Sequence, residues 1–186
     1  MTLPPIPPTP AMGQPPHWYP ADQHPQPPES GLIDWLCDQG SLTLRLTDAG
    51  ANDFRVELLA QSSQPAREDE ARALGLPPGE PVWVREVLLH TGGAPRVFAR
   101  SVAPLAAISA SNIDLQSLGS NSLGLLLFSN PDVSRGPLQI SRYPSAWLPS
   151  PWREQAAKCW ARRSHFSDGQ LQLLVCEVFL PGWPQA

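Results

Sequence analysis

The sequence lacks any hydrophobic run long enough to cross a membrane. Its longest purely apolar run lies at 125–128 with its neighbours, whereas a membrane-spanning helix needs roughly 18 to 20 such residues. A secretory signal is also lacking, because prolines from Pro4 onward interrupt the region where a basic segment and an apolar stretch would stand. We therefore expect a cytoplasmic protein without a membrane span.

Cysteine is scarce and histidine is scattered. The three cysteines, Cys37, Cys159 and Cys176, form no Cys-x-x-Cys pair, and an odd number in a cytosolic chain argues against a disulfide framework. We interpret them as reduced, structural residues. The four histidines show neither the i, i+4 spacing nor the neighbouring carboxylates of a metal site, so we expect no metal.

Positive charge is also limited, and it comes almost wholly from arginine. The formal net charge is -4, and Lys158 is the only lysine. Nucleic-acid binding depends on clustered Lys and Arg that release counterions, so we expect no nucleic-acid partner. Two interpretations of the arginine content stay open: a compositional bias that also favours Ala and Pro, or the use of the arginine fork to hold carboxylates.

Proline, by contrast, is abundant and concentrated at the N-terminus. Residues 1–29 carry 11 of the 24 prolines and few aliphatic side chains, so they bury too little surface to offset the entropy of ordering. We predict a disordered or polyproline tail over 1–29 that is not part of the fold, followed by a single domain over 30–186. A structural adaptor recruited through this tail is one alternative function.

Two pairs of β-rich segments predict antiparallel hairpins. The segments 82–90 and 96–103 flank a turn that contains Gly92 and Gly93, which can supply the positive φ angles of a tight turn. The segments 158–166 and 170–180 repeat this arrangement around Ser-Asp-Gly. We expect both hairpins to belong to one sheet.

Shorter patterns complete the prediction of an α+β fold. Helical spacing and end signals predict helices over 30–40 and 68–74, and alternation predicts a strand over 53–60. Without a regular alternation of strands and helices, we expect a single antiparallel β-sheet with helices on one side. The remaining segments are interpreted as helical or irregular at 115–118 and 123–128, as a strand at 138–142, and as a long surface insertion at 143–157.

Five separated blocks, taken in order, resemble the chorismate pyruvate-lyase family. Together they cover roughly residues 31 to 181, and their conjunction makes the resemblance specific. The blocks are DWL at 34–36 with SLT at 41–43, WVREVLL at 83–89, FARSVAP at 98–104, LG at 118–119 and 123–124 ahead of LF at 127–128, and ARRS at 161–164 with EVFLP at 177–181.

The resemblance implies a fold and an activity. The fold would be an antiparallel sheet with helical and loop flaps over a buried, water-poor pocket. The activity would be the conversion of chorismate into 4-hydroxybenzoate and pyruvate for ubiquinone, without cofactor or metal and with strong retention of the aromatic product. By position, Arg85 would bind a carboxylate, Glu177 would meet the ring hydroxyl, and Leu42 and Leu123 would supply backbone hydrogen bonds. The family also implies a monomer.

The sequence departs from the family pattern at two of these places. Leu42 stands where methionine is common, and Ser122 stands where proline often precedes Leu-Gly. If the contact at position 42 is made by the backbone amide, the side chain need only be apolar and of similar volume. The segment 143–157 is a larger departure, and it either reshapes the rim of the site or lies on the surface.

The chemistry of chorismate explains why the site would need these types of residue. The substrate is a dianion, and its ring becomes aromatic when the enolpyruvyl group leaves C3 and the hydrogen at C4 is lost. Arg85 could grip a carboxylate through two hydrogen bonds, or it could form a structural ion pair. Glu177 stands among apolar strand residues, and a buried carboxylate needs a donor, a proton or the substrate. Arg100, Arg162 and Arg163 are candidates for the second carboxylate, or ordinary strand charges.

Two further functions stay open. Small-molecule-sensing domains of some bacterial regulators resemble this fold, but they usually follow a DNA-binding helix-turn-helix, which the proline-rich residues before 30 cannot form. A lyase that releases another hydroxybenzoate would use a similar pocket. The sequence also leaves open whether the C4 proton moves directly to the enolpyruvyl methylene or through a general base.

Overall fold

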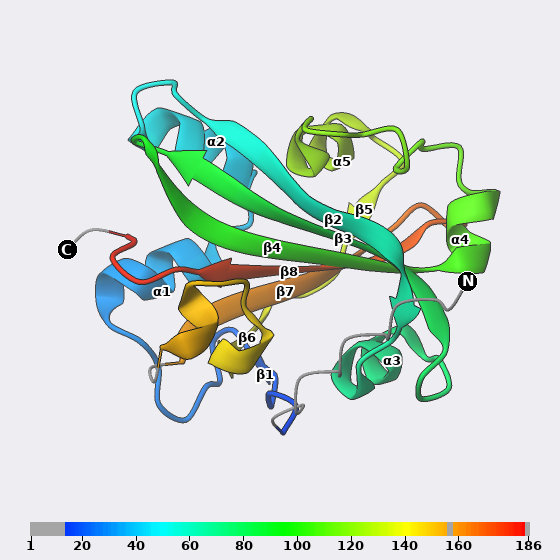
Figure 1. Ribbon diagram of the computed structural model, residues 1–186, viewed down its shortest axis with the longest axis horizontal. Coiled ribbons are helices and arrows are strands. Elements are labelled where there is room, and N and C mark those ends of the chain that lie inside the picture. The colour runs from blue at the N-terminus through cyan, green and yellow to red at the C-terminus, as the bar shows by residue number, and fades with distance from the viewer. Residues whose placement is uncertain (1–13, 156–157, 185–186) are drawn as a thin grey trace, which may run out of the picture.

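A twisted antiparallel sheet forms the centre of the protein, seen here in a computed structural model that describes residues 14–155 and 158–184 (Figure 1). Within these residues the sheet has eight strands in the order β1-β6-β7-β8-β4-β3-β2, and β5 pairs with β7. The strands are β1 Tyr19–Pro20, β2 Arg55–Pro65, β3 Pro81–Thr91, β4 Ala94–Pro104, β5 Ser134–Arg135, β6 Gln139–Tyr143, β7 Cys159–Ser167 and β8 Gln172–Phe179.

Short helices connect and cover these strands. None of the described helices is long and apolar enough to cross a membrane. The helices are α1 Ser30–Cys37, α2 Leu42–Ala49, α3 Glu68–Leu74, α4 Leu105–Ala110 and α5 Leu123–Ser129, with two 3-10 turns, η1 Ser145–Trp147 and η2 Trp152–Glu154.

Both predicted hairpins are confirmed, and the register between them aligns the residues of interest. The first hairpin joins β3 and β4 through Gly92 and Gly93, whose φ angles are 61° and 75°; glycine adopts such positive values without steric cost. The second joins β7 and β8, and β8 pairs with β4. Glu177 therefore lies opposite Ala99 on one side and Arg162 on the other.

Alternation along the strands divides the side chains between two faces. On β3, Trp83, Val87 and Leu89 pack with residues of α1, α2 and α5, and we call this side the α2–α5 face. Val82 and Val84 pack with Ala71 of α3, and we call that side the α3 face. The expectation of helices on one side holds for α1, α2 and α5, whereas α3 and the 3-10 turns cover the opposite face.

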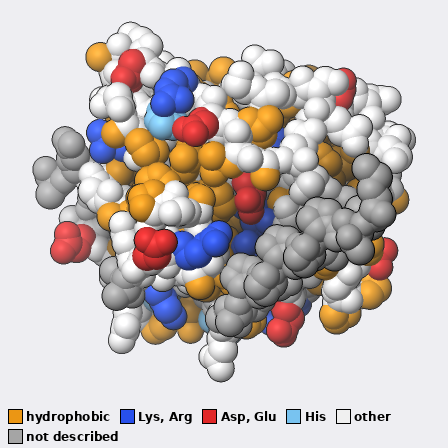
Figure 2. Space-filling model, in the orientation of Figure 1, with side chains coloured by type: hydrophobic (Ala, Val, Ile, Leu, Met, Phe, Trp, Pro, Cys, Tyr) orange, Lys and Arg blue, Asp and Glu red, His pale blue; other side chains and the backbone are white. Residues whose placement is uncertain are grey.

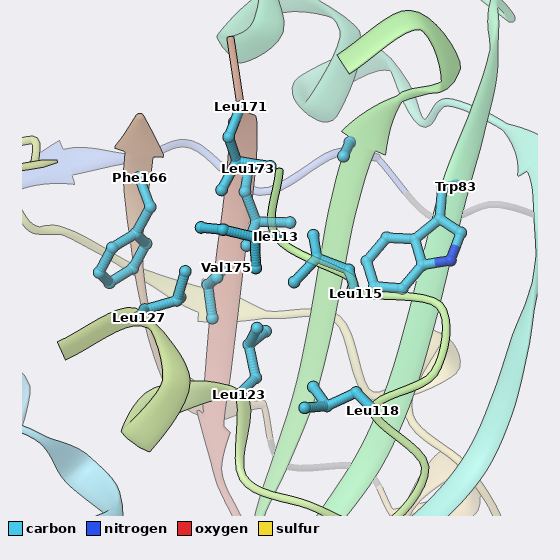
Figure 3. Packing of buried hydrophobic residues seen from close by; sticks show 11 residues of the cluster. Trp83, Ile113, Leu115, Leu118, Leu123, Leu127, Phe166, Leu171, Leu173 and Val175 are labelled. Carbon is cyan, nitrogen blue, oxygen red and sulfur yellow. The ribbon is translucent and has the colours of Figure 1, made fainter. Parts of the chain in front are cut away.

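The α2–α5 face is sealed by the chain between β4 and β5. Leu123 and Leu127 of α5 pack on Phe166 and Val175 of the sheet (Figure 3). Further along the same face, the preceding loop adds Leu115 and other apolar side chains that lie against Trp83. This packing holds the start of α5, at Leu123, close to the sheet.

The segment 143–157 differs from the expected surface insertion. Tyr143, Trp147 and Leu148 are buried on the α3 face, where they pack with Phe98 and Val178 of the sheet. The two residues 156–157 lie outside the described chain. Its aromatic side chains thus belong to the core, although the prolines around them suggested a surface loop.

The fold also begins earlier than the expected boundary at residue 30. Strand β1 pairs with β6, the Ser141 hydroxyl donates to the His17 carbonyl at 2.6 Å, and the Trp18 indole N–H donates to Asp69 at 2.9 Å. Aromatic residues between the prolines thus anchor this segment to the α3 face. The first 13 residues of the predicted tail lie outside the described residues.

The visible surface carries charges of both signs. Figure 2 shows acidic and basic side chains interspersed among hydrophobic ones on the face turned to the viewer, with undescribed residues in grey over part of it. This mixture is consistent with the small net charge of -4.

Candidate active site

A small cavity lies between the sheet and the first turns of α2 and α5, with a volume of about 40 Å³. Its walls are largely apolar, but arginine and glutamate side chains also reach it. They are Leu42, Thr43, Arg85, Val87, Leu89, Ala99, Ser101, Leu123, Gly124, Leu127, Phe128, Arg135, Arg162, Phe166, Val175 and Glu177. All four residues that the family resemblance singled out are therefore in one place.

Arg85 is a buried cation on β3 without a carboxylate beside it. Only 2% of the residue is exposed, and its Nη2 donates to the carbonyls of Gly119 and Asn121 at 2.9 and 3.0 Å. Its Nε is buried without a partner, and burial lowers the pKa of the guanidinium. Among the described residues, no acidic oxygen lies within 4.0 Å of it. Arg85 thus has no contacting carboxylate among the described residues, and an anionic ligand can supply one.

Glu177 on β8 shares the cavity and is held by Arg162 on β7. Its Oε2 accepts from the Arg162 Nε at 2.6 Å. Arg162 is almost fully buried, and its Nη1 also donates to the carbonyls of Trp35 and Asp38 at 2.9 and 2.8 Å. Because Arg162 has these partners already, it orients Glu177 and is a poor candidate for binding a free carboxylate.

Leu42 and Leu123 occupy equivalent places, as the first residues of α2 and α5. The amide of a first helical residue has no acceptor within its own helix. The preceding serines cap the helices, since the hydroxyls of Ser41 and Ser122 accept from amides further along each first turn. The two starts contact each other through a 2.7 Å hydrogen bond between the hydroxyls of Thr43 and Ser122. Within the described part of the chain, the amides of Leu42 and Leu123 have no hydrogen-bond acceptor, and both residues line the cavity.

Of the two interpretations left open for Arg100 and Arg163, the structure supports ion pairing and not a place in this cavity, because both lie on the α3 face. Arg100 bonds to Glu70 at 2.6 and 3.1 Å and to Glu86 at 2.8 Å. Arg163 bonds to the Gln139 side chain at 2.9 Å and has Asp69 at 3.5 Å. Strand alternation is the cause: successive residues of β7 point to opposite faces, so Arg162 and Arg163 cannot share one site.

Sequence reasoning missed Arg135, which also lines the cavity. It lies on the two-residue strand β5, too short for any periodic pattern to mark it. Its Nε donates to the Ser164 hydroxyl at 2.8 Å and its Nη1 to the Gln39 carbonyl at 3.1 Å. The guanidinium lies 5.6 Å from the ring centre of Phe128 and 5.3 Å from that of Phe166.

A larger hollow of about 840 Å³ lies outside this cavity, but its lining residues give a weaker indication of a bound ligand. It is an open groove between the segment before α1 and the end of the chain, with His24, Arg142, Trp160 and Trp183 among its lining residues. Arg142 there is exposed, so water can solvate its charge, and it stacks on Trp160. In the described chain, moreover, no group of three or more His, Cys, Asp or Glu side chains is arranged as metal ligands.

Comparison with known proteins identifies a family that matches most of the chain. The family model for chorismate lyase matches residues 12–186. A probable chorismate pyruvate-lyase of Pseudomonas aeruginosa is 51% identical over 83% of this chain and 86% of its own length. One of Pseudomonas putida is 47% identical over 91% of this chain and 90% of its own length.

Solved structures share the fold at low sequence identity. The C-terminal domain of PhnF has a TM-score of 0.54 and 21% identity, over 67% of this chain and 80% of that one. A GntR-family transcriptional regulator from Bacillus cereus has a TM-score of 0.51 and 14% identity, over 72% of this chain and 96% of that one. At these identities the similarity concerns the fold alone.

Proposed function

The chain belongs to the chorismate lyase family, and from that premise we propose that it is a chorismate pyruvate-lyase, releasing 4-hydroxybenzoate and pyruvate for ubiquinone biosynthesis. The observation that carries this proposal is Arg85, a buried guanidinium beside an apolar cavity without a protein carboxylate to neutralise it. Such a group is costly to the fold unless a ligand supplies the anion.

The reaction requires positioning more than a nucleophile. The C3–O ether bond of chorismate breaks, and its electrons leave with the enolpyruvyl group. The C4–H bond supplies the electrons that complete the aromatic ring. The proton lost from C4 and the proton gained by the enolpyruvyl methylene balance, so that the products are 4-hydroxybenzoate and pyruvate. Aromatisation supplies the driving force, and the site contributes orientation and an environment with little water.

Arg85 would hold the ring carboxylate at one end of the cavity. Its Nη2 already donates to the Gly119 and Asn121 carbonyls, so its Nε and Nη1 are the nitrogens that would donate to a carboxylate, and a guanidinium stays charged in a buried site. The free amides of Leu42 and Leu123 would add two donors, and the positive ends of two helices favour an anion between them. Each donor comes from a different element, so the ring carboxylate would fix α2, α5 and β3 around it.

Glu177 would accept a hydrogen bond from the C4 hydroxyl at the other end. The bond from Arg162 occupies Oε2, so Oε1 is the oxygen available to the substrate. A carboxylate placed there fixes the ring and aligns the C4 hydrogen with the departing group. Two proton routes stay open, direct transfer to the methylene or transfer through a base. A reaction in deuterium oxide that leaves pyruvate without solvent deuterium would select the first.

The helices over the cavity would act as flaps. The cavity of about 40 Å³ is much smaller than the roughly 300 to 1,000 Å³ typical of ligand pockets. Entry of chorismate would therefore require α2 and α5 to move away from the sheet, and a movement of one helix away from the other would break the bond between Thr43 and Ser122. Closure over the ring would then retain the aromatic product.

The direct test is product identification from chorismate incubated with the full chain. We expect 4-hydroxybenzoate by chromatography and an equal amount of pyruvate by a coupled lactate dehydrogenase assay. Heat-denatured protein is the control for spontaneous breakdown. A different hydroxybenzoate would retain the lyase class but overturn the product, whereas binding without turnover would favour the small-molecule-sensing alternative suggested by the regulator folds.

We also propose that the protein is a cytoplasmic monomer, as the family resemblance implies. Size-exclusion chromatography with light scattering should give a mass near 20.3 kDa. Twice that mass would contradict the monomer.

A further inference from the structure

We propose that Arg135 binds the second carboxylate of chorismate, the one on the enolpyruvyl group, and so makes the site selective for the dianionic substrate over the monoanionic product. This inference rests on the proposed function. It assigns a binding role to a residue outside the four positions that the family resemblance supplied.

The two negative charges of chorismate, compared with the arginines that line the cavity, single out Arg135. Chorismate carries two carboxylates, and Arg85 provides for one of them. Arg162 is committed to Glu177 and to two backbone carbonyls. Among the arginines that line the cavity, this leaves Arg135 for the other carboxylate.

Arg135 is held in place in a way that keeps one nitrogen available. Its Nε and Nη1 donate to Ser164 and to the Gln39 carbonyl. The rings of Phe128 and Phe166 lie near the guanidinium, which restricts its movement and favours its charge. Within the described residues its Nη2 has no hydrogen bond, and no acidic oxygen lies within 4.0 Å of the guanidinium. The side chain is preorganised but its charge is not neutralised by contact.

The location of Arg135 suits the enolpyruvyl group and not the ring carboxylate. Its partner Ser164 lies two residues beyond Arg162 on the same face of β7, beside the strand that carries Glu177. Burial lowers the pKa of Arg135, and the nearby charge of Glu177 acts in the opposite direction, as expected for groups at the same end of the cavity. The enolpyruvyl ether is on C3, adjacent to the C4 hydroxyl that Glu177 would hold. A carboxylate on that ether would therefore lie towards Arg135.

The experiment separates substrate from product. In Arg135→Gln we expect kcat/KM for chorismate to fall roughly 10- to 100-fold, the usual effect of losing a charge-assisted hydrogen bond. The Kd for 4-hydroxybenzoate, measured by calorimetry, should stay within about twofold, since the product lacks the second carboxylate. Arg135→Lys, which retains the charge, should recover part of kcat/KM and serves as a second test if the glutamine variant does not fold.

Two comparisons make the result specific. Arg142→Gln removes another aromatic-stacked arginine, on β6 and away from the cavity, and should leave both constants unchanged. Arg85→Gln should weaken substrate and product alike. Unchanged kcat/KM in both Arg135 variants, or an equal loss of product affinity, would overturn the role of Arg135 and leave the lyase assignment standing. Absence of turnover by the unmodified chain would overturn both.

Discussion

The two faces of the sheet use the same residue type in opposite ways. On the α3 face, Arg100 contacts two glutamates at 2.6 and 2.8 Å, and Arg163 lies 3.5 Å from Asp69. On the α2–α5 face, Arg162 is paired with Glu177 at 2.6 Å, but two arginines lack such a pair: within the described residues Arg85 contacts backbone carbonyls, and Arg135 a hydroxyl and a carbonyl. Paired guanidinium groups hold the α3 face together, whereas unpaired ones mark the place for an anion.

The hydrogen-bond and ion-pair partners of a buried arginine therefore indicate its role, whereas its degree of burial does not. Arg85 and Arg100 are equally buried, at 2% exposure each. Their strands are neighbours in the sheet, yet the side chains point to opposite faces. The difference in their partners therefore predicts different costs of removing each one.

The largest expected effect is on stability. Replacing Arg100 by Met leaves Glu70 buried without its cation, and breaking a buried pair in this way costs about 3–5 kcal/mol of unfolding free energy. Arg85→Met leaves no protein carboxylate unpaired but removes the donor to the Gly119 and Asn121 carbonyls, so we expect a smaller loss of about 1–3 kcal/mol. Urea denaturation of the two variants measures both. Equal losses would mean that the two faces do not differ as described.

The next effect reverses the order of the two arginines. Arg85→Met should reduce kcat/KM for chorismate by roughly 100-fold, in line with a lost charge-assisted contact, mainly by weakening substrate capture. Steady-state kinetics at low and high chorismate give the two constants separately. A folded Arg85 variant with full activity would remove Arg85 from the site.

A smaller loss of turnover is expected at Glu177. Glu177→Gln keeps the shape but removes the charge that orients the ring, and we expect kcat to fall roughly 10-fold while product affinity changes less. Single-turnover measurements separate the chemical step from product release. A loss confined to KM would indicate a role in binding alone.

The α3 face should also respond to acid. Burial opposes the charge of Glu70, but the hydrogen bonds and charge of Arg100 outweigh burial and hold its pKa below the usual 4.5. A lowered pKa contributes stability that is present above pH 4.5 and is lost as the pH falls through the folded-state value. Glu70→Gln should therefore flatten the decline in unfolding free energy below about pH 4.5.

Asp69 provides the control for this acid response. Burial raises its pKa, so its contribution is present at low pH and is lost as the pH rises through that pKa. Asp69→Asn should leave the decline at low pH in place. A flattened acid limb in this variant would contradict the role given to Glu70.

The smallest effect is expected where a charge pair is exposed. Arg72 and Glu68 form an i, i+4 pair at 2.7 Å on the solvent side of α3, and such pairs contribute about 0.2–0.5 kcal/mol. Glu68→Gln should shift the unfolding free energy by no more than that. A loss similar to that of Arg100→Met would mean that the partners of a charged side chain do not by themselves determine how much unfolding free energy its removal costs.

Local patterns predicted the parts of the fold that depend on neighbours in sequence. The two hairpins, the helix from Ser30 and the helix over 68–74 all follow from turn residues and spacing. No element was predicted over 42–49, where Leu42, Leu44 and Leu46 alternate as in a strand but the structure has helix α2. In the structure Leu42 and Leu46 are buried one helical turn apart, while Leu44 is 56% exposed.

The parts that were mispredicted depend on tertiary contacts. The aromatic residues at 18, 143 and 147 stand among prolines, and only packing on the α3 face reveals their role. For the site, alternation within β7 could have separated Arg162 from Arg163, but sequence alone does not say which face holds the cavity. Arg135 had no local signal, since its cavity is assembled from helices and strands far apart in the chain.

The positions of Leu42 and Leu123 have one more consequence. If the group offered to the ligand is the amide of the main chain, then evolution can exchange leucine for methionine there without altering the chemistry. Proline is the one amino acid whose backbone nitrogen carries no hydrogen in a peptide chain, so it cannot donate this hydrogen bond. At these two positions the requirement would be a backbone amide hydrogen and an aliphatic side chain of suitable volume. Proline would be excluded, while an exchange between aliphatic residues would have almost no effect.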